Sequence, residues 1–87
     1  MTTEELTKLK NDLREVTSGP WKSYVEGRDH TSGSGFVMTG DSNYDIDFTG
    51  IRVVDQDFIA AARNAMPYLI DEVLRLRAIL SQHKISF

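Results

Sequence analysis

The apolar residues near the N-terminus recur with the period of an α-helix. Four of them follow one another at steps of three and four residues: Leu6, Leu9, Leu13 and Val16. This spacing places them on one stripe of a helix. Thr2 and Glu5 have the spacing of a capping box, in which side chains satisfy the free amides of a helix N-terminus. Gly19 and Pro20 disfavour continuation, so we predict a helix over about residues 3–17.

In the middle of the chain the period changes from about 3.6 residues to 2, which is typical of strands. We predict strands at residues 21–26, 36–39 and 44–49, and a fourth short strand, or an extension of the third, at residues 51–54. Residues 40–43 provide a reversal of the kind that joins antiparallel strands. The short connections favour an antiparallel meander, because parallel pairing needs a crossover of about a dozen residues or more.

Alternation along these strands assigns the side chains to two faces of the sheet. The face toward the helices is expected to carry Trp21, Val25, Phe36, Met38, Ile46 and Phe48. The outer, solvated face is expected to carry Tyr24, Val37, Asp45, Asp47 and Arg52, with Lys22 and Glu26 beside them. An exposed tyrosine with acidic neighbours makes this outer face a candidate docking surface for a basic partner.

Helical periodicity returns at Asp55, which we predict to cap a helix N-terminus. Pro67 lacks an amide hydrogen and disfavours the helical conformation of the residue before it. We therefore predict a short helix over residues 56–65, a break or kink, and a longer helix over residues 67–82; one continuous kinked helix is the alternative. The predicted fold is one α+β domain over residues 1–87, a two-layer sandwich with an N-terminal helix, a three- or four-stranded antiparallel meander, and C-terminal helices broken or kinked at Pro67.

The composition narrows the classes of function. The chain has no cysteine, which excludes disulfides and thiolate chemistry. Its formal net charge of −3 disfavours duplex nucleic acid as a partner, because neutralisation of phosphates supplies most non-specific affinity. No apolar stretch approaches the roughly 20 residues that span a bilayer. Met1 is followed by Thr-Thr-Glu-Glu rather than by a basic and then apolar signal, so we expect a cytoplasmic protein that does not bind a membrane.

Two groups of polar residues partly match the residue patterns of known functional sites. Asp29, His30 and Ser32 are the residue types of a catalytic triad, but three neighbours on one glycine-rich loop do not point their side chains at one another. The alternating oxygens that begin at Asp41 resemble the opening of a calcium loop, yet Ile46 stands where such a loop needs glycine. We interpret both groups as solvated loops. The sequence therefore predicts no enzyme activity, no metal site and no cofactor.

Two surfaces remain as candidates for binding. The residues that we assign to partner binding lie on the outer sheet face and the adjoining loops: Tyr24, Arg28, Asp41, Asp45, Asp47 and Arg52. On the last predicted helix, an apolar seam steps by four, three and four residues: Leu69, Val73, Leu76 and Leu80. This is the spacing of a heptad seam, which can bring together two copies of a chain or capture a partner helix. The alternative is burial of this seam against the sheet and the first helix.

Two stretches of the chain resemble a family. Gly19-Pro20-Trp21 follows the first helix, and residues 55–77 read D-x-x-F-I-A-x-A-R-x-x-x-P-x-L-I-x-E-V-x-R-L-R. This resembles a group of small, mostly uncharacterised proteins from bacteria, phages and prophages that share the GPW motif, a variable strand region and this ending. The resemblance implies a setting of mobile elements and of toxin–antitoxin-like or immunity loci, where small acidic proteins neutralise a partner. It transfers no catalytic or binding residue.

The sequence supports three hypotheses about the function of the chain. The first is a non-enzymatic protein-interaction module, either an inhibitor or immunity protein or a phage-type accessory protein, that binds a protein partner through an acidic sheet face. The second is a structural homo-oligomer that assembles through the C-terminal seam, so that the chain is a monomer or a homodimer. The third is a small enzyme or ligand-binding domain.

Overall fold

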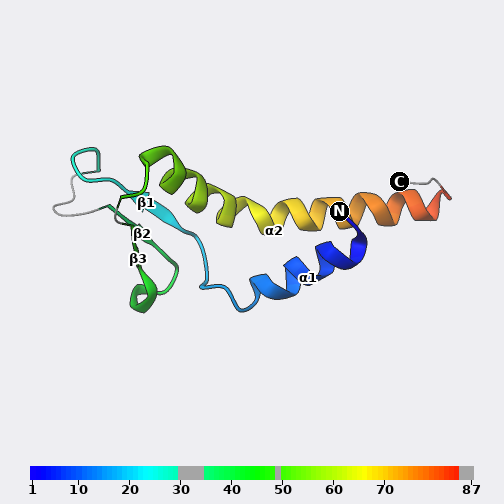
Figure 1. Ribbon diagram of the computed structural model, residues 1–87. Helices are drawn as coiled ribbons and strands as arrows, with labels where there is room; N and C mark the ends of the chain where they lie inside the picture. Colours follow the sequence, from blue (N-terminus) through cyan, green and yellow to red (C-terminus); the bar gives the residue numbers. More distant parts are fainter. Residues whose placement is uncertain (30–34, 49, 85–87) are drawn as a thin grey trace. The chain divides into compact units, whose positions relative to one another are not determined.

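The computed structural model describes residues 1–29, 35–48 and 50–84 (Figure 1). The elements follow in the order α1 (Thr3–Leu13), β1 (Lys22–Tyr24), β2 (Phe36–Met38), the 3₁₀ helix η1 (Ser42–Tyr44), β3 (Ile46–Asp47) and α2 (Val53–Gln82). A first helix, a three-stranded antiparallel sheet and a long last helix make this an α+β protein, as predicted. In the described part of the chain, neither helix is long and apolar enough to cross a membrane.

The chain divides into two compact units. The sheet unit, Thr17–Asn64, contains the three strands and the first part of α2. The helical unit contains α1 and the second part of α2, from Met1–Val16 and Ala65–Phe87.

α1 begins with the predicted capping box. The Thr2 hydroxyl accepts a hydrogen bond from the Glu5 amide (3.0 Å), and the Thr2 amide donates to the Glu5 carboxylate (3.1 Å). The helix ends at Leu13, four residues before the predicted end. The Arg14 amide bonds to the carbonyl three residues before it rather than four (3.1 Å), and this tighter turn closes the helix. The side chain of Val16 beyond it is exposed.

In the helical unit, α1 lies antiparallel to the second part of α2 (Figure 1). The ammonium group of Lys10 pairs with the carboxylate of Asp71 (3.0 Å). Near the other end, the Arg77 guanidinium donates to the carbonyl oxygen of Met1 (2.6 Å). Ile70, which lies seven residues before Arg77 and therefore on the same side of α2, is buried.

The three strands pair in the order β1-β2-β3, all antiparallel. The paired residues are Lys22 with Met38, Ser23 with Val37, Tyr24 with Phe36, Phe36 with Asp47, and Val37 with Ile46. Paired residues share a face of a sheet. The inner face therefore carries Ser23, Val37 and Ile46, and the first part of α2 covers it, because the Gln56 amide of that helix bonds to the Ser23 hydroxyl (2.8 Å).

This register corrects the prediction for β2. We expected Phe36 and Met38 to face the helices and Val37 to face solvent, whereas Val37 is fully buried and the other two side chains lie on the outer face. The strand consists of three apolar residues, so no alternation marks its buried side, and a shift of one residue exchanges the faces. The predicted faces of β1 and β3 are confirmed, with Tyr24 and Asp47 on the outer side.

The third predicted strand is shorter than expected. Among its described residues, Ile46 and Asp47 pair with β2, whereas Tyr44 belongs to η1. The Asp41 carboxylate accepts a hydrogen bond from the Asn43 amide (3.0 Å) and caps this 3₁₀ turn. Local side-chain bonding of this kind competes with strand pairing.

The prediction of a fourth strand at residues 51–54 is wrong, because α2 begins within that range and earlier than predicted. Val53 is its first residue, and the Arg52 carbonyl accepts hydrogen bonds from the amides of Asp55 and Gln56 (both 3.1 Å). Asp55 is therefore inside the first turn rather than at the cap. The helix is continuous through Pro67, which excludes a break there. Proline costs about 3 kcal/mol in a helix interior, and α2 is formed despite that cost.

Candidate functional site

The outer face of the sheet carries a cluster of apolar side chains. The rings of Tyr24 and Phe36 are stacked, with centroids 5.1 Å apart and an angle of 16° between the planes. Met38 lies on the same face and is 40% exposed. The Lys22 ammonium group lies 5.0 Å from the centroid of the Tyr24 ring, and Asp47 stands opposite Phe36. We call these five residues the outer sheet patch.

The chemistry of this patch suits contact with a protein surface. Aromatic rings with a half-exposed face supply large contact area, and tyrosine adds a polar tip. The cation over the Tyr24 ring gains from the ring quadrupole. Lysine and aspartate at its two sides provide charges of both signs. Such a surface can bind and orient a partner.

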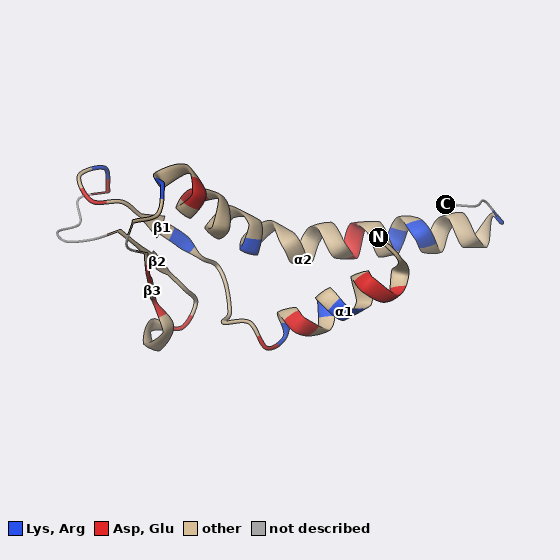
Figure 2. Cartoon of the chain, in the orientation of Figure 1, with Lys and Arg blue, Asp and Glu red and all other residues tan. Residues whose placement is uncertain are grey.

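Of the three acidic residues predicted for this surface, Asp47 belongs to the outer sheet patch, whereas Asp41 and Asp45 lie in the turn between β2 and β3. In this turn, the Asp41 carboxylate accepts a hydrogen bond from the Asn43 amide (3.0 Å). The Asp45 carboxylate accepts one from the Thr39 amide (3.3 Å). Arg52 is the residue directly before α2, and its carbonyl oxygen accepts hydrogen bonds from amides in the first turn of that helix. Acidic and basic residues are spread over both helices and the loops of the chain (Figure 2). Of the residues assigned to partner binding, the structure brings together Tyr24 and Asp47.

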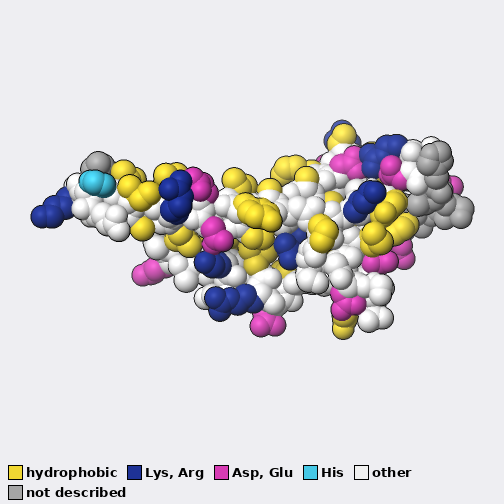
Figure 3. All heavy atoms as spheres, turned by 180° about the vertical axis from the view of Figure 1, so that it is seen from behind, with side chains coloured by type: hydrophobic (Ala, Val, Ile, Leu, Met, Phe, Trp, Pro, Cys, Tyr) yellow, Lys and Arg dark blue, Asp and Glu magenta, His cyan; other side chains and the backbone are white. Residues whose placement is uncertain are grey.

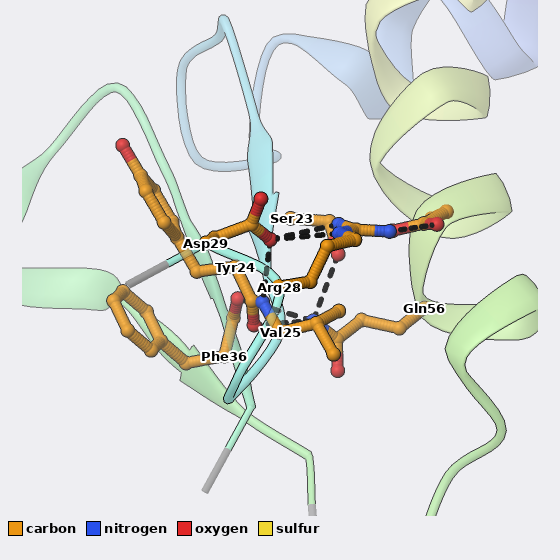
Figure 4. A network of polar contacts seen from close by, with 8 residues as sticks. Ser23, Tyr24, Val25, Arg28, Asp29, Phe36 and Gln56 are labelled. Atoms are coloured by element: carbon orange, nitrogen blue, oxygen red, sulfur yellow. Dashed lines mark hydrogen bonds and ion pairs between the residues drawn. The ribbon is translucent and has the colours of Figure 1, made fainter. Parts of the chain in front are cut away.

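Arg28 lies in an ion-pair network rather than on the patch (Figure 4). Its guanidinium makes two hydrogen bonds to the Asp57 carboxylate, at 2.7 and 3.1 Å, and one to Asp29 at 3.0 Å. Asp29 also accepts the amide of Val25 (2.8 Å). These bonds lower the pKa of the Asp29 and Asp57 carboxyl groups below their ordinary values, and the hydrogen bond from Arg28 is the largest cause for each. The network ties the loop after β1 to the first part of α2.

The Arg28–Asp57 pair predicts a pH dependence of stability. Because the pKa of Asp57 is lowered in the folded chain, its contribution is present above the unfolded pKa of about 3.9 and is lost as the pH falls. We expect Asp57→Asn to lower the urea midpoint at pH 7 and to reduce its fall between pH 5 and pH 2. Asp55→Asn, which removes the same charge on the same turn of α2, is the control and should lower the urea midpoint at pH 7 by less than Asp57→Asn does. An unchanged profile in Asp57→Asn would contradict this role.

The sheet is positioned by Gln56, which the sequence analysis did not single out. This side chain is 3% exposed. Its amide nitrogen lies within hydrogen-bonding distance of the Ser23 hydroxyl (2.8 Å) and of the carbonyl oxygens of Tyr24 (2.9 Å) and Phe36 (3.2 Å). One amide thus connects α2 to both β1 and β2 (Figure 4). Gln56 lies four residues before Ala60, so the two share one face of the helix; both are buried, but the sequence pattern did not mark that face as buried.

Asn64 makes the second connection. Its side-chain oxygen accepts the Trp21 amide and its nitrogen donates to the Trp21 carbonyl, both at 2.7 Å. The Trp21 indole and the Arg63 guanidinium both donate to the carbonyl oxygen of Thr17, at 3.0 and 3.4 Å. The GPW motif and the C-terminal motif therefore contact each other through structural residues.

The predicted helical seam is only partly exposed. Leu69 and Leu76 are exposed, whereas Val73 and Leu80 are half-buried. His30 and Ser32, two of the three triad residue types, lie outside the described residues. Within residues 1–29, 35–48 and 50–84, no group of three or more His, Cys, Asp and Glu side chains is placed to hold a metal ion.

Comparison with known proteins finds no match: no family model matches the chain, and no curated protein or solved structure is significantly similar to it. The resemblance of the two motifs to phage and prophage proteins stays a prediction.

Proposed function

We propose that this chain is a non-enzymatic protein-interaction module whose partner binds the outer sheet patch. The observation that carries the proposal is the stacked pair of Tyr24 and Phe36 beside the exposed side chain of Met38. Aromatic and methionine side chains are enriched in protein interfaces, where they bury large areas. Lys22 and Asp47 supply the polar rim that surrounds the apolar centre of such interfaces.

The role that we propose is that of a cytoplasmic inhibitor or immunity protein, or of a phage-type accessory protein. Support comes from the net charge of −3 and from the GPW and C-terminal motifs. The sequence alone suggested an acidic face for a basic partner. The contact that we now favour is largely apolar, with Asp47 as its acidic group, because Asp41 and Asp45 accept backbone amides in the turn.

The test is capture of a partner from lysate of the source organism by tagged wild-type protein and by two variants, at low and high salt. Met38→Glu breaks the patch, yet it places a carboxylate opposite Lys22, so that the cross-strand pair remains favourable. Val54→Glu is the matched control, because Val54 is an exposed apolar residue on α2 in the same unit. We expect Met38→Glu to reduce recovery of the partner at least about tenfold, equivalent to roughly 1.4 kcal/mol.

One pattern of partner recovery would contradict binding at the outer sheet patch. Equal recovery by wild type and Met38→Glu, with Val54→Glu reduced, would move the binding surface from the sheet to the helix. Circular dichroism of the three proteins checks that the substitutions leave the fold unchanged. Because the proposed contact is mostly apolar, salt should weaken it only modestly.

Exposure of Leu69 and Leu76 favours the second hypothesis, a homo-oligomer that assembles through α2. The seam first considered, which also includes Val73 and Leu80, is half-buried at those two positions. A self-association surface on α2 therefore has to be centred on other residues. The third hypothesis, a small enzyme or ligand-binding domain, has no observation of this kind in its favour.

A further inference from the structure

The second part of α2 carries an exposed stripe. Tyr68, Glu72, Arg75 and Ile79 follow at steps of four, three and four residues, and Leu69 and Leu76 flank them. These six residues, which we call the outward stripe, share one face of the helix. Its four apolar side chains are exposed: Tyr68 by 78%, Leu69 by 59%, Leu76 by 45% and Ile79 by 38%. In the space-filling view, hydrophobic side chains alternate with charged ones along this helix (Figure 3).

Within the helical unit, α1 contacts a different side of α2. Ile70 is buried and Arg77 bonds to the first residues of the chain. Ile70 comes two residues before Glu72, a separation of about 200° around a helix, so it faces almost opposite to the stripe. α2 is therefore apolar on two opposing sides, and α1 covers only one of them.

The order of residues along the stripe is self-complementary. From Tyr68 to Ile79 it runs apolar, acidic, basic, apolar at the central positions Tyr68, Glu72, Arg75 and Ile79. If a second copy lies antiparallel, with the two-fold axis midway between residues 73 and 74, Tyr68 faces Ile79 of the other copy and Glu72 faces Arg75. The flanking residues Leu69 and Leu76 then also approach each other. In a parallel pair in register, by contrast, Glu72 would face Glu72.

The two charged residues favour this orientation. The Arg75 guanidinium already bonds to the Glu72 carboxylate, at 2.6 and 3.2 Å, and it lowers the pKa of that carboxyl group. Both side chains are more than half exposed, so each retains donors or acceptors for a second partner. Two such pairs, related by the two-fold axis, form four charges of alternating sign. Polar positions inside a helical seam select the orientation and register of its partner.

We propose that the outward stripe binds a second copy of this chain in an antiparallel helix pair centred on Glu72 and Arg75. Six residues a side make a small interface, at the weak end of specific association. The pair should therefore form reversibly, with a dissociation constant in the micromolar range or above. This association gives the second hypothesis, self-assembly through α2, a specific surface and orientation. It is independent of binding at the outer sheet patch, because it uses a different unit of the chain.

Sedimentation equilibrium over a concentration series tests the association. Wild type should approach twice the monomer mass at high concentration, and Leu69→Glu should raise the dissociation constant at least about tenfold. Ala78→Glu is the control, because it adds the same charge at an exposed position of α2 outside the stripe. A wild-type chain that stays monomeric up to about 1 mM would overturn the proposal, and so would an equal effect of the control. Circular dichroism verifies that both variants keep their helices.

The orientation has its own test, because the chain has no cysteine. Tyr68→Cys and Ile79→Cys are oxidised separately and as a mixture. The antiparallel pair predicts a disulfide-linked dimer mainly in the mixture, since each introduced thiol faces the other position across the axis. Efficient cross-linking of either variant alone would indicate a parallel pair and overturn the proposed geometry. A dimer that cross-links in none of the three samples would also overturn it.

Discussion

Gln56→Leu is expected to lower the free energy of unfolding by about 2–4 kcal/mol. The Gln56 amide is the shared donor to the Ser23 hydroxyl and to the carbonyl oxygens of Tyr24 and Phe36. Leucine fits the buried helix face but cannot donate, so these acceptors lose their partner without gaining water. An unsatisfied buried polar group costs about 1–3 kcal/mol. For a chain of 87 residues, this corresponds to a fall in melting temperature on the order of 10–20 °C.

Urea unfolding followed by circular dichroism measures this effect. Gln82→Leu, an exposed glutamine at the end of the same helix, is the matched control and should change stability by less than about 0.5 kcal/mol. A Gln56→Leu variant as stable as the control would show that the amide does not hold β1 and β2 to α2. The outer sheet patch should also lose partner binding in Gln56→Leu, because Tyr24 and Phe36 are placed by the strands that this amide connects.

Gly40→Ala is the substitution with the second largest expected effect, a loss of about 1–3 kcal/mol. Gly40 packs directly on the backbone before the GPW motif, and its amide donates to the Ser18 carbonyl oxygen (2.7 Å). A Cβ at this position would lie 2.5 Å from that oxygen and 2.8 Å from the Ser18 carbonyl carbon, and it would also contact the Gly19 oxygen. Backbone atoms cannot rotate away as a side chain can, so the turn and the segment before β1 have to separate.

Gly19→Ala is the control for this effect. A Cβ there would meet the side chains of Arg63 and Asn64 at 3.5–3.6 Å, an ordinary contact distance. We expect this variant to unfold at a urea concentration close to that of wild type. If both alanine variants were equally destabilised, the loss of stability would follow from replacing a glycine at either position. It would then not be caused by the close approach of Gly40 to the Ser18 backbone.

The parts of the fold that the sequence predicted well depend on neighbours in the chain. The capping box of Thr2 and Glu5 formed as expected because both partners lie within one turn. The faces of β1 and β3 followed from alternation over a few residues. Errors arose where the local pattern was uniform or where two local rules competed. The apolar strand Phe36–Met38 offered no alternation, and the local cost of Pro67 did not interrupt α2.

The candidate site was predicted in part for the same reason. Tyr24 and Asp47 were assigned to the outer face and lie there. The stacking of Tyr24 on Phe36 depends on the pairing of two strands, which the period of one strand does not contain. Likewise, Arg28 was assigned to the partner surface, but it pairs with Asp57, 29 residues further along the chain.

By itself, the sequence determined the class of the protein: an acidic, cysteine-free α+β chain with a capped first helix, a short antiparallel meander and a helical C-terminal region. These properties come from interactions over about two to four residues, which hydrophobic period and caps report directly. Only the tertiary structure decided which side of β2 is buried, that Gln56 and Asn64 hold the sheet to α2, and which face of α2 stays exposed. Those outcomes depend on contacts between residues far apart in the chain, where many pairings satisfy the same local pattern and packing selects one of them.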